Sequence, residues 1–246
     1  MQNYDFGEPN NEHGIKRYPE ERFEIMGPPR PGKPFSLHEH LRFQRVVSHL
    51  APGSVLDVGA YFGDFLKAAR AAGHEIAGTE VNQARCDTAN EALGEKVVVE
   101  DFRHGCLAQF GDRQFDNVVC MEVIEHLPDD RIAVHELCRV ANKRVIVTVP
   151  FDERIIKDRC IHCGELNPRN GHLRKYDFDT FQTRLPESGW KLAANQQFGH
   201  RRATRLAGRF PGQGMQMAVG LKLDRWLCAR KSARATWLLA ILERTG

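Results

Sequence analysis

The segment Ser54-Val-Leu-Asp-Val-Gly-Ala-Tyr-Phe-Gly-Asp-Phe65 constrains the fold of this chain more than any other. Its run of apolar and β-branched residues ends at Gly59 and predicts a strand covered on both faces, as in a parallel sheet. Gly59 lets the backbone turn sharply beside a ligand, and Gly63 allows the next helix to pack closely. The start of that helix offers free N–H groups and a positive dipole end, which favour a nucleotide-type ligand.

The turn differs from the dinucleotide-binding fingerprint, which has glycine at the third position to admit a pyrophosphate. Tyr61 occupies that position, which disfavours a nicotinamide-dependent oxidoreductase. The segment resembles motif I of the class I S-adenosylmethionine (SAM)-dependent methyltransferases, usually V-L-D-x-G-x-G-x-G. That resemblance implies a Rossmann-like α/β fold with seven strands, mostly parallel with an antiparallel last strand, and SAM as the cofactor. Tyr61 replaces the middle glycine and is expected to narrow the space beside the methionine moiety.

Length and composition fit one globular domain with additions. The chain has 246 residues and a formal net charge of +3, so nothing in its overall charge requires DNA as a partner. No apolar run approaches the ~20 residues that a membrane-spanning helix needs. The first residues lack the basic start and apolar stretch of a secretory signal, so we expect a cytoplasmic location.

The order of elements predicts an N-terminal arm or lid at residues 1–35 and a methyltransferase domain at 36–246. Ser36 and Glu39 form a capping box that starts a helix, and strands and helices then alternate as in a βαβ series. The predicted parts of the domain are a SAM-binding core at 54–150, a cysteine-containing loop at 151–176 and a basic helical insert at 200–234. We expect strands at 54–58, 74–79, 96–100, 115–121, 143–149, 190–198 and 237–242, with further helices at 64–72, 83–93, 129–141 and near 177–188.

Residues just after the parallel strands are expected to form the cofactor site, because ligands of doubly wound sheets bind there. Glu80 ends the second strand, where a carboxylate can accept both hydrogen bonds of a ribose diol. Asp101 follows the third strand, where an acid in the resembling family faces the adenine amino group and Phe102 can stack. Each acid alone is more often a helix cap or a solvated side chain, but their order after the glycine turn favours SAM. The predicted cofactor-binding residues are Asp57, Gly59, Ala60, Tyr61, Gly63, Glu80, Asp101, Phe102 and Met121.

The segment Cys120-Met-Glu-Val-Ile-Glu-His-Leu-Pro-Asp129 follows the fourth strand. It resembles the E-V-I/L-E-H-L segment of small-molecule, glycan and quinone methyltransferases, where it lies beside the transferred methyl group. If the segment is helical, Glu122, Glu125 and His126 share one face. They can then act as a general base, or hold a divalent metal, Mg²⁺ or Zn²⁺, that lowers the pKa of an acceptor hydroxyl. The alternative is that Glu125 and His126 only cap and orient the following helix.

The same segment is similar to the metal site of the small-RNA 3′-end ribose 2′-O-methyltransferases, which add a downstream histidine. His172 is the candidate for that histidine. Our first hypothesis is O-methylation of a hydroxyl on a small molecule or glycan precursor, and the RNA reaction is the second. A non-catalytic SAM-binding interaction module is the hypothesis from another class, and the intact acids at the strand ends argue against it.

Cys160 and Cys163 form a Cys-x-x-Cys pair, whereas the other five of the seven cysteines stand alone. With His172 and His162 they could bind zinc; reduced thiols in a turn and a redox pair are the alternatives. Because one imidazole cannot serve two metals, the zinc hypothesis competes with a metal held by Glu125 and His126.

The insert between His200 and Arg234 carries nine lysines and arginines against one acid, Asp224. Its interleaved apolar residues predict an amphipathic helix between the last two strands. A solvated helix packed on the sheet edge explains this pattern. An anionic acceptor also explains it, whether a phosphorylated sugar, a lipid-linked glycan at an anionic membrane surface, or RNA.

Overall fold

A computed structural model describes residues 3–4, 18–19, 36–160, 164–229 and 235–245 of the chain. Most of the predicted N-terminal arm, and Cys163 with His162, lie outside these residues. Within the arm, the short strands β1 (Asn3–Tyr4) and β2 (Tyr18–Pro19) pair antiparallel. The predicted domain boundaries stay a prediction.

The centre of the fold is a seven-stranded sheet in the order β10-β11-β7-β6-β3-β4-β5. Six strands run parallel, and β11 runs antiparallel between β7 and β10, which confirms the predicted fold class. The strands are β3 (Ser54–Val58), β4 (Glu75–Glu80), β5 (Val97–Val99), β6 (Phe115–Met121), β7 (Ala141–Pro150), β10 (Trp190–Phe198) and β11 (Trp237–Arg244).

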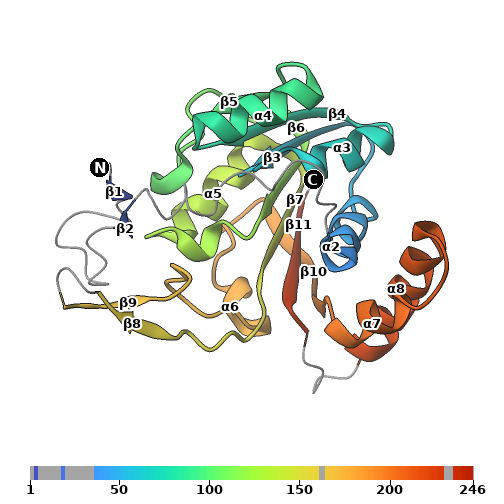
Figure 1. The fold of residues 1–246 in the computed structure, drawn as a ribbon. Helices are drawn as coiled ribbons and strands as arrows, with labels where there is room; N and C mark the ends of the chain where they lie inside the picture. The colour runs from blue at the N-terminus through green and yellow to red at the C-terminus, as the bar shows by residue number, and fades with distance from the viewer. Residues whose placement is uncertain (1–2, 5–17, 20–35, 161–163, 230–234, 246) are drawn as a thin grey trace.

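Helices cover both faces of this sheet (Figure 1). They are α2 (Leu37–Val47), α3 (Asp64–Ala71), α4 (Gln83–Leu93), α5 (Asp130–Val140), α6 (Phe178–Gln182), α7 (Arg201–Ala207) and α8 (Gln213–Cys228), with 3-10 turns η1 (Phe102–His104) and η2 (Ile124–His126). The predicted capping box starts α2: Ser36 Oγ accepts from the Glu39 N–H, and the Glu39 carboxylate accepts from the Ser36 N–H.

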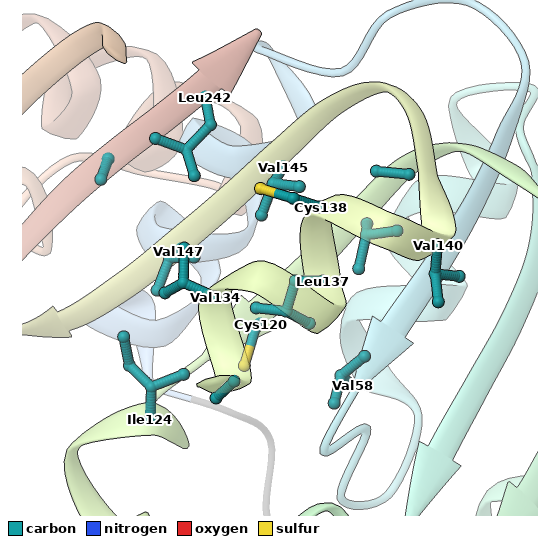
Figure 2. Close-up of a cluster of buried hydrophobic side chains, with 14 of the residues drawn as sticks. Val58, Cys120, Ile124, Val134, Leu137, Cys138, Val140, Val145, Val147 and Leu242 are labelled. Atoms are coloured by element: carbon teal, nitrogen blue, oxygen red, sulfur yellow. The ribbon is translucent and has the colours of Figure 1, made fainter. Parts of the chain in front are cut away.

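Two buried clusters lie on the two sides of the sheet. One is built from α2, α3 and α4, and includes Leu41, Phe65 and Ala89. The other is built mainly from α5 and the strands beneath it. Figure 2 shows this second cluster, with side chains from β3, β6, β7, α5 and β11: Val58, Cys120, Val134, Leu137, Cys138, Val140, Val145, Val147 and Leu242. Strands buried on both faces explain the continuous apolar runs in the sequence.

The structure corrects two predicted helices. The helix expected near 177–188 is the shorter α6, because Pro186 disfavours helical backbone at Leu185. The insert contains two helices rather than one, since Pro211 and Gly212 break it and Gly212 adopts φ +73°. An ideal Cβ at Gly220 of α8 would lie 3.4 Å from both Ala207 and Leu41, so α8 packs on α7 and α2. Within the described residues, every helix is too short or too polar to cross a bilayer.

Candidate functional site

A cavity of ≈ 680 Å³ lies at the carboxyl ends of β3, β4, β5 and β6. Its lining includes most of the residues predicted to bind the cofactor: Asp57, Gly59, Ala60, Tyr61, Glu80, Asp101, Phe102 and Met121. Gly63 is the predicted residue that does not line it. Because these side chains come from four strand ends separated in sequence, the fold brings them together as the strand-end rule predicts. Their binding of a cofactor stays a prediction.

The two glycines of the turn have different structural roles. Gly59 adopts φ +83°, and a Cβ there would lie 2.5 Å from Cγ2 of Val123, so glycine lets Val123 pack against the turn. Gly63 adopts φ +74°, and its Cβ would lie 2.5 Å from Cδ1 of Leu93 in α4. Gly63 therefore serves the close packing of α3 against α4.

Tyr61 stands where the usual motif has its middle glycine. The backbone conformation of Tyr61 explains why the motif prefers glycine there. Its φ is +53°, in the left-handed region that glycine adopts freely and other residues adopt at a cost of about 1–2 kcal/mol. Its ring contacts Phe62 edge-on, with ring centroids 4.1 Å apart, and the Arg85 guanidinium lies 4.7 Å from its centre. The ring thus forms part of the cavity wall.

Glu80 is held rigidly at the end of β4. It is 4% exposed, and its two oxygens accept from the backbone N–H of Tyr61 at 3.0 Å and of Asn82 at 3.1 Å. Burial raises the pKa of Glu80, while these hydrogen bonds and the charge of Arg85 oppose the rise. The carboxylate is therefore fixed in direction before any ligand arrives.

Asp101 and Asp57 contrast in their partners. Asp101 is more exposed and accepts hydrogen bonds from the Arg103 side chain at 2.5–2.9 Å. Desolvation acts to raise the pKa of Asp101, but these hydrogen bonds outweigh it and lower the pKa. Asp57 is 1% exposed, and its Oδ1 has no hydrogen-bond partner among the described residues. Burial raises the pKa of Asp57 to about 7, with Arg42 opposing and Glu80 reinforcing the rise.

His126 and His172 line the same cavity and form a second group with the buried Glu125 behind them. One ligand atom from each lies within 4.8 Å of the others. Glu125 is fully buried, and neither carboxylate oxygen has a hydrogen-bond partner among the described residues. Burial, followed by the charge of Glu122, raises the pKa of Glu125 well above its ordinary value. A carboxyl group in such a place either keeps its proton or, once ionised, binds a cation.

Glu122 lies apart from this group, which differs from the shared helical face expected. The segment after β6 forms the 3-10 turn η2 rather than an α-helix, and Glu122 itself adopts φ +57°. Its Oε1 accepts from Thr148 Oγ1 and its Oε2 from Trp237 Nε1, each at 3.1 Å. Burial raises the pKa of Glu122, whereas Arg42 and these hydrogen bonds oppose the rise.

The acceptors beside the two histidines determine which ring nitrogen carries a proton. His126 Nδ1 lies 3.2 Å from the carbonyl oxygen of Gly171, and His172 Nδ1 contacts the Glu153 carboxylate. A carbonyl or carboxylate oxygen only accepts, so both Nδ1 atoms carry a proton, and a neutral ring then has its lone pair on Nε2. Burial, followed by the charge of His172, lowers the pKa of His126 to about 4, so His126 is neutral at neutral pH.

Residues 171–174 are joined to the η2 turn by main-chain contacts. The Leu173 N–H donates to the Glu125 carbonyl at 2.8 Å. The Arg174 guanidinium donates to the carbonyls of Leu127 at 2.5 Å and Pro128 at 2.6 Å. These bonds satisfy carbonyls at the end of a 3-10 turn and fix His172 beside Glu125.

Sequence reasoning missed three residues of this site: Glu153, Trp237 and Arg42. Glu153 follows β7, so the strand-end rule used for the other strands would have found it. Trp237 reaches Glu122 because β11 inserts beside β7, and Arg42 lies 4.0 Å from Glu122 and 5.0 Å from the Trp237 ring centre. Neither has a local sequence signal.

The zinc hypothesis stays a prediction, because Cys163 and His162 lie outside the described residues. Cys160 follows β8 (Lys157–Arg159), which pairs antiparallel with β9 (Leu166–Pro168). The ring of His172 is placed in the group with Glu125 and His126.

Comparison with known proteins agrees with this geometry. Residues 56–149 match a family model described as a methyltransferase domain. Over this segment the chain is similar to the class I methyltransferases. The ubiquinone biosynthesis O-methyltransferase of Actinobacillus pleuropneumoniae serotype 7 is 29% identical over 121 residues, 45% of this chain and 51% of that protein. The protein of the same name from Methylococcus capsulatus is 32% identical over 106 residues, 41% of this chain and 45% of that protein. The chain thus spans about half the length of the curated relatives it matches.

Solved structures share the fold at low sequence identity. A SAM-dependent methyltransferase from Mesorhizobium loti is 14% identical with a TM-score of 0.57, covering 84% of this chain and 98% of that one. The methyltransferase in a complex with the Haloferax volcanii Trm112 activator is 16% identical with a TM-score of 0.56, covering 85% and 90%.

The class I methyltransferase family implies SAM as the cofactor, and the cavity fits it. SAM carries an ammonium group, a ribose diol and an adenine ring. Asp57 has one oxygen without a hydrogen-bond partner among the described residues, and this oxygen can accept from a cationic or hydroxyl group. The fixed Glu80 carboxylate can accept from a diol. Gly59 contributes bare backbone to the lining of the same cavity.

Proposed function

We propose that this protein is a SAM-dependent methyltransferase that methylates a hydroxyl of a small molecule or a glycan precursor. The observation that carries this proposal is the position of His126 and His172 in the lining of the cavity that also contains Glu80. A candidate proton acceptor thus adjoins the proposed cofactor site. The relatives named O-methyltransferases support the same chemistry.

SAM supplies, when bound, a methyl carbon attached to a positively charged sulfur. The protein must then align an acceptor hydroxyl and remove its proton. His172 is suited to take that proton on Nε2, because Glu153 holds its Nδ1–H and stabilises the imidazolium that forms. His126 stays neutral because its pKa is lowered to about 4 by burial and His172, so it adds no positive charge that would oppose this step.

The same residues also suit a divalent metal, which we propose as the second way of activating the hydroxyl. A buried carboxylate and two imidazoles whose ligand atoms lie within 4.8 Å of one another are common metal ligands, and Glu153 behind His172 is a typical outer partner. Such a metal would lower the pKa of the acceptor. This group of ligands is the observation that favours the second candidate function, metal-dependent methylation of the 3′-terminal ribose of RNA.

The first experiment is calorimetric titration with SAM, S-adenosylhomocysteine and NADH. We expect micromolar binding of the two sulfur compounds and none of NADH. A panel of hydroxyl acceptors, with an RNA oligonucleotide ending in a 3′ ribose, then identifies the substrate class by transfer of a labelled methyl group. Absence of SAM and S-adenosylhomocysteine binding would overturn the proposal in favour of a non-catalytic interaction module.

Two variants separate catalysis from cofactor binding. His172→Ala is expected to reduce methyl transfer at least tenfold without changing the Kd for SAM. Glu125→Gln should do the same if the group holds a metal, and should have little effect if His172 acts as the base. His135→Ala in α5 is the matched control, because His135 lies outside the cavity lining. Restoration of chelator-treated enzyme by Mn²⁺ or Mg²⁺ would establish the metal route, and full activity without metal would establish the base route.

A further inference from the structure

A second cavity, of ≈ 920 Å³, adjoins the first and shares Glu122 and His172 with it. Its floor includes the apolar residues Pro150 and Phe151 at the end of β7. Its size lies within the range of small-molecule sites. Because it touches His172, a molecule in it can place a hydroxyl beside the proposed proton acceptor.

The helix α7 contributes the charged part of this lining, namely Arg201 and Arg202, together with its N-cap His200. Both arginines are exposed, and within the described residues their guanidinium groups form no ion pair and no side-chain hydrogen bond. Burial and the charge of Arg201 together lower the pKa of His38, whose ring contacts Thr236 in the same lining. The charge of Arg201 thus acts on the neighbouring ring of His38 in α2.

The acids near these arginines already have other partners. Asp224, the single acid of the insert, is 2% exposed and accepts from the His200 N–H at 2.6 Å. Glu122 accepts from Thr148 and Trp237, and Glu153 contacts His172. The cavity thus combines a hydroxyl-activating end, an apolar floor and two arginines that form no ion pair among the described residues.

We propose that this second cavity binds the acceptor through an oxyanion, a carboxylate or a phosphate, held by Arg201 and Arg202. The inference rests on the proposed function, since it names the class of acceptor. Guanidinium groups match the geometry of both oxyanions with paired hydrogen bonds. The acceptor then carries a hydroxyl near His172 and an apolar or ring-like body over Phe151.

Two other arginines of the same surface distinguish this proposal from general surface charge. Arg205 lies in α7 and Arg209 just after it, and both are exposed but do not line the cavity. If the positive charge acted only as a solvated surface, removing either pair would have the same effect. A site requires that only the pair at residues 201 and 202 matters.

The test is calorimetric titration of the full chain with benzoate, phenyl phosphate and neutral benzyl alcohol, with and without S-adenosylhomocysteine. We expect the anions to bind at least tenfold more tightly than the alcohol, with the tighter anion identifying the acceptor group. Arg201→Gln/Arg202→Gln should weaken anion binding at least tenfold, and Arg205→Gln/Arg209→Gln should not. Equal effects of the two double variants, or equal binding of all three probes, would overturn the proposal.

A measurement on the unmodified protein keeps the test valid if the first variant misfolds. Phenylglyoxal labels exposed arginines, and benzoate should protect residues 201 and 202 but leave 205 and 209 reactive, as read by mass spectrometry. Equal labelling with and without benzoate would contradict the site. Binding of these probes does not require methyl transfer. If the protein bound the anions at residues 201 and 202 but did not bind SAM, the proposed function would be overturned and the anion site would stand.

Discussion

The indole of Trp237, the first residue of β11, donates a hydrogen bond of 3.1 Å from Nε1 to Oε2 of Glu122 at the end of β6. The last strand of the chain thereby fixes an acid that lies in the lining of both cavities. Thr148 of β7 holds the other carboxylate oxygen at 3.1 Å. Glu122 is therefore positioned by two neighbouring strands of the sheet.

Trp237→Phe tests whether this positioning matters for turnover. The variant keeps an aromatic ring beside His38 and Phe198 but removes the N–H donor. We expect kcat to fall severalfold, the Kd for SAM to stay unchanged, and stability to fall by about 1 kcal/mol from the lost hydrogen bond. Trp190→Phe is the matched control, because Trp190 contacts Arg244 far from Glu122. Equal kcat values for the two variants would show that the bond to Glu122 is dispensable.

Glu80→Gln tests the predicted cofactor contact. The amide keeps the shape of the carboxylate but sets an NH₂ group against a backbone N–H of Tyr61 or Asn82, and it removes the charge. We expect SAM binding to weaken by roughly 1–3 kcal/mol, measured by calorimetry. Glu75→Gln, at the exposed start of the same strand, should bind SAM as the unmodified protein does. An unchanged Kd for Glu80→Gln would remove Glu80 from the site.

The strands of the sheet were predictable because their signal is local. Residues 54–58, 115–121 and 190–198 form strands with the expected bounds, and in the first two an apolar run ends at a glycine or a polar residue. The strand-end acids Glu80 and Asp101 followed from this order. The short α6 depended on one proline, and the break between α7 and α8 on a Pro-Gly pair, both of which the apolar pattern concealed.

The details of the proton-accepting group depend on contacts between distant segments. The left-handed backbone of Glu122 is unusual for a residue other than glycine, and no propensity indicates it. The position of His172 depends on the hydrogen bond from Leu173 to Glu125 and on the contact with Glu153. The sequence supplied these residue types, but only the folded chain determines which of them meet.

Gly63→Ala tests the packing role of the second glycine in the turn. A Cβ at residue 63 would lie 2.5 Å from Cδ1 of Leu93, whereas one at Gly73, which also has positive φ, would meet nothing within 4 Å. Both substitutions carry the backbone cost of about 1–2 kcal/mol, but Gly63→Ala adds a clash worth about 1–3 kcal/mol. Urea unfolding should therefore show the larger loss for Gly63→Ala, and the excess should shrink in a Leu93→Ala background. Equal losses for the two glycines would contradict the close packing of α3 on α4.

The raised pKa of Asp57 predicts how the stability of the ligand-free protein depends on pH. Its native pKa is raised to about 7 by burial, while an unfolded aspartate has a pKa of about 3.9. Between these values the native state holds a proton that the unfolded state has lost, so the stabilisation is complete below about pH 4 and disappears as the pH rises through 7. We expect this group to lower the free energy of unfolding by about 2–3 kcal/mol between pH 5 and pH 8.

Asp57→Asn isolates this contribution, because asparagine has the same size and does not titrate. Urea unfolding of both proteins at pH 5, 6, 7 and 8 measures the difference in their unfolding free energies, from which the titration of all other groups cancels if they are unaffected. The unmodified protein should lose about 2–3 kcal/mol relative to the variant across this range. Parallel profiles would mean that Asp57 is already ionised at pH 5 in the native state, and that its unpartnered oxygen is stabilised as a carboxylate even without a ligand.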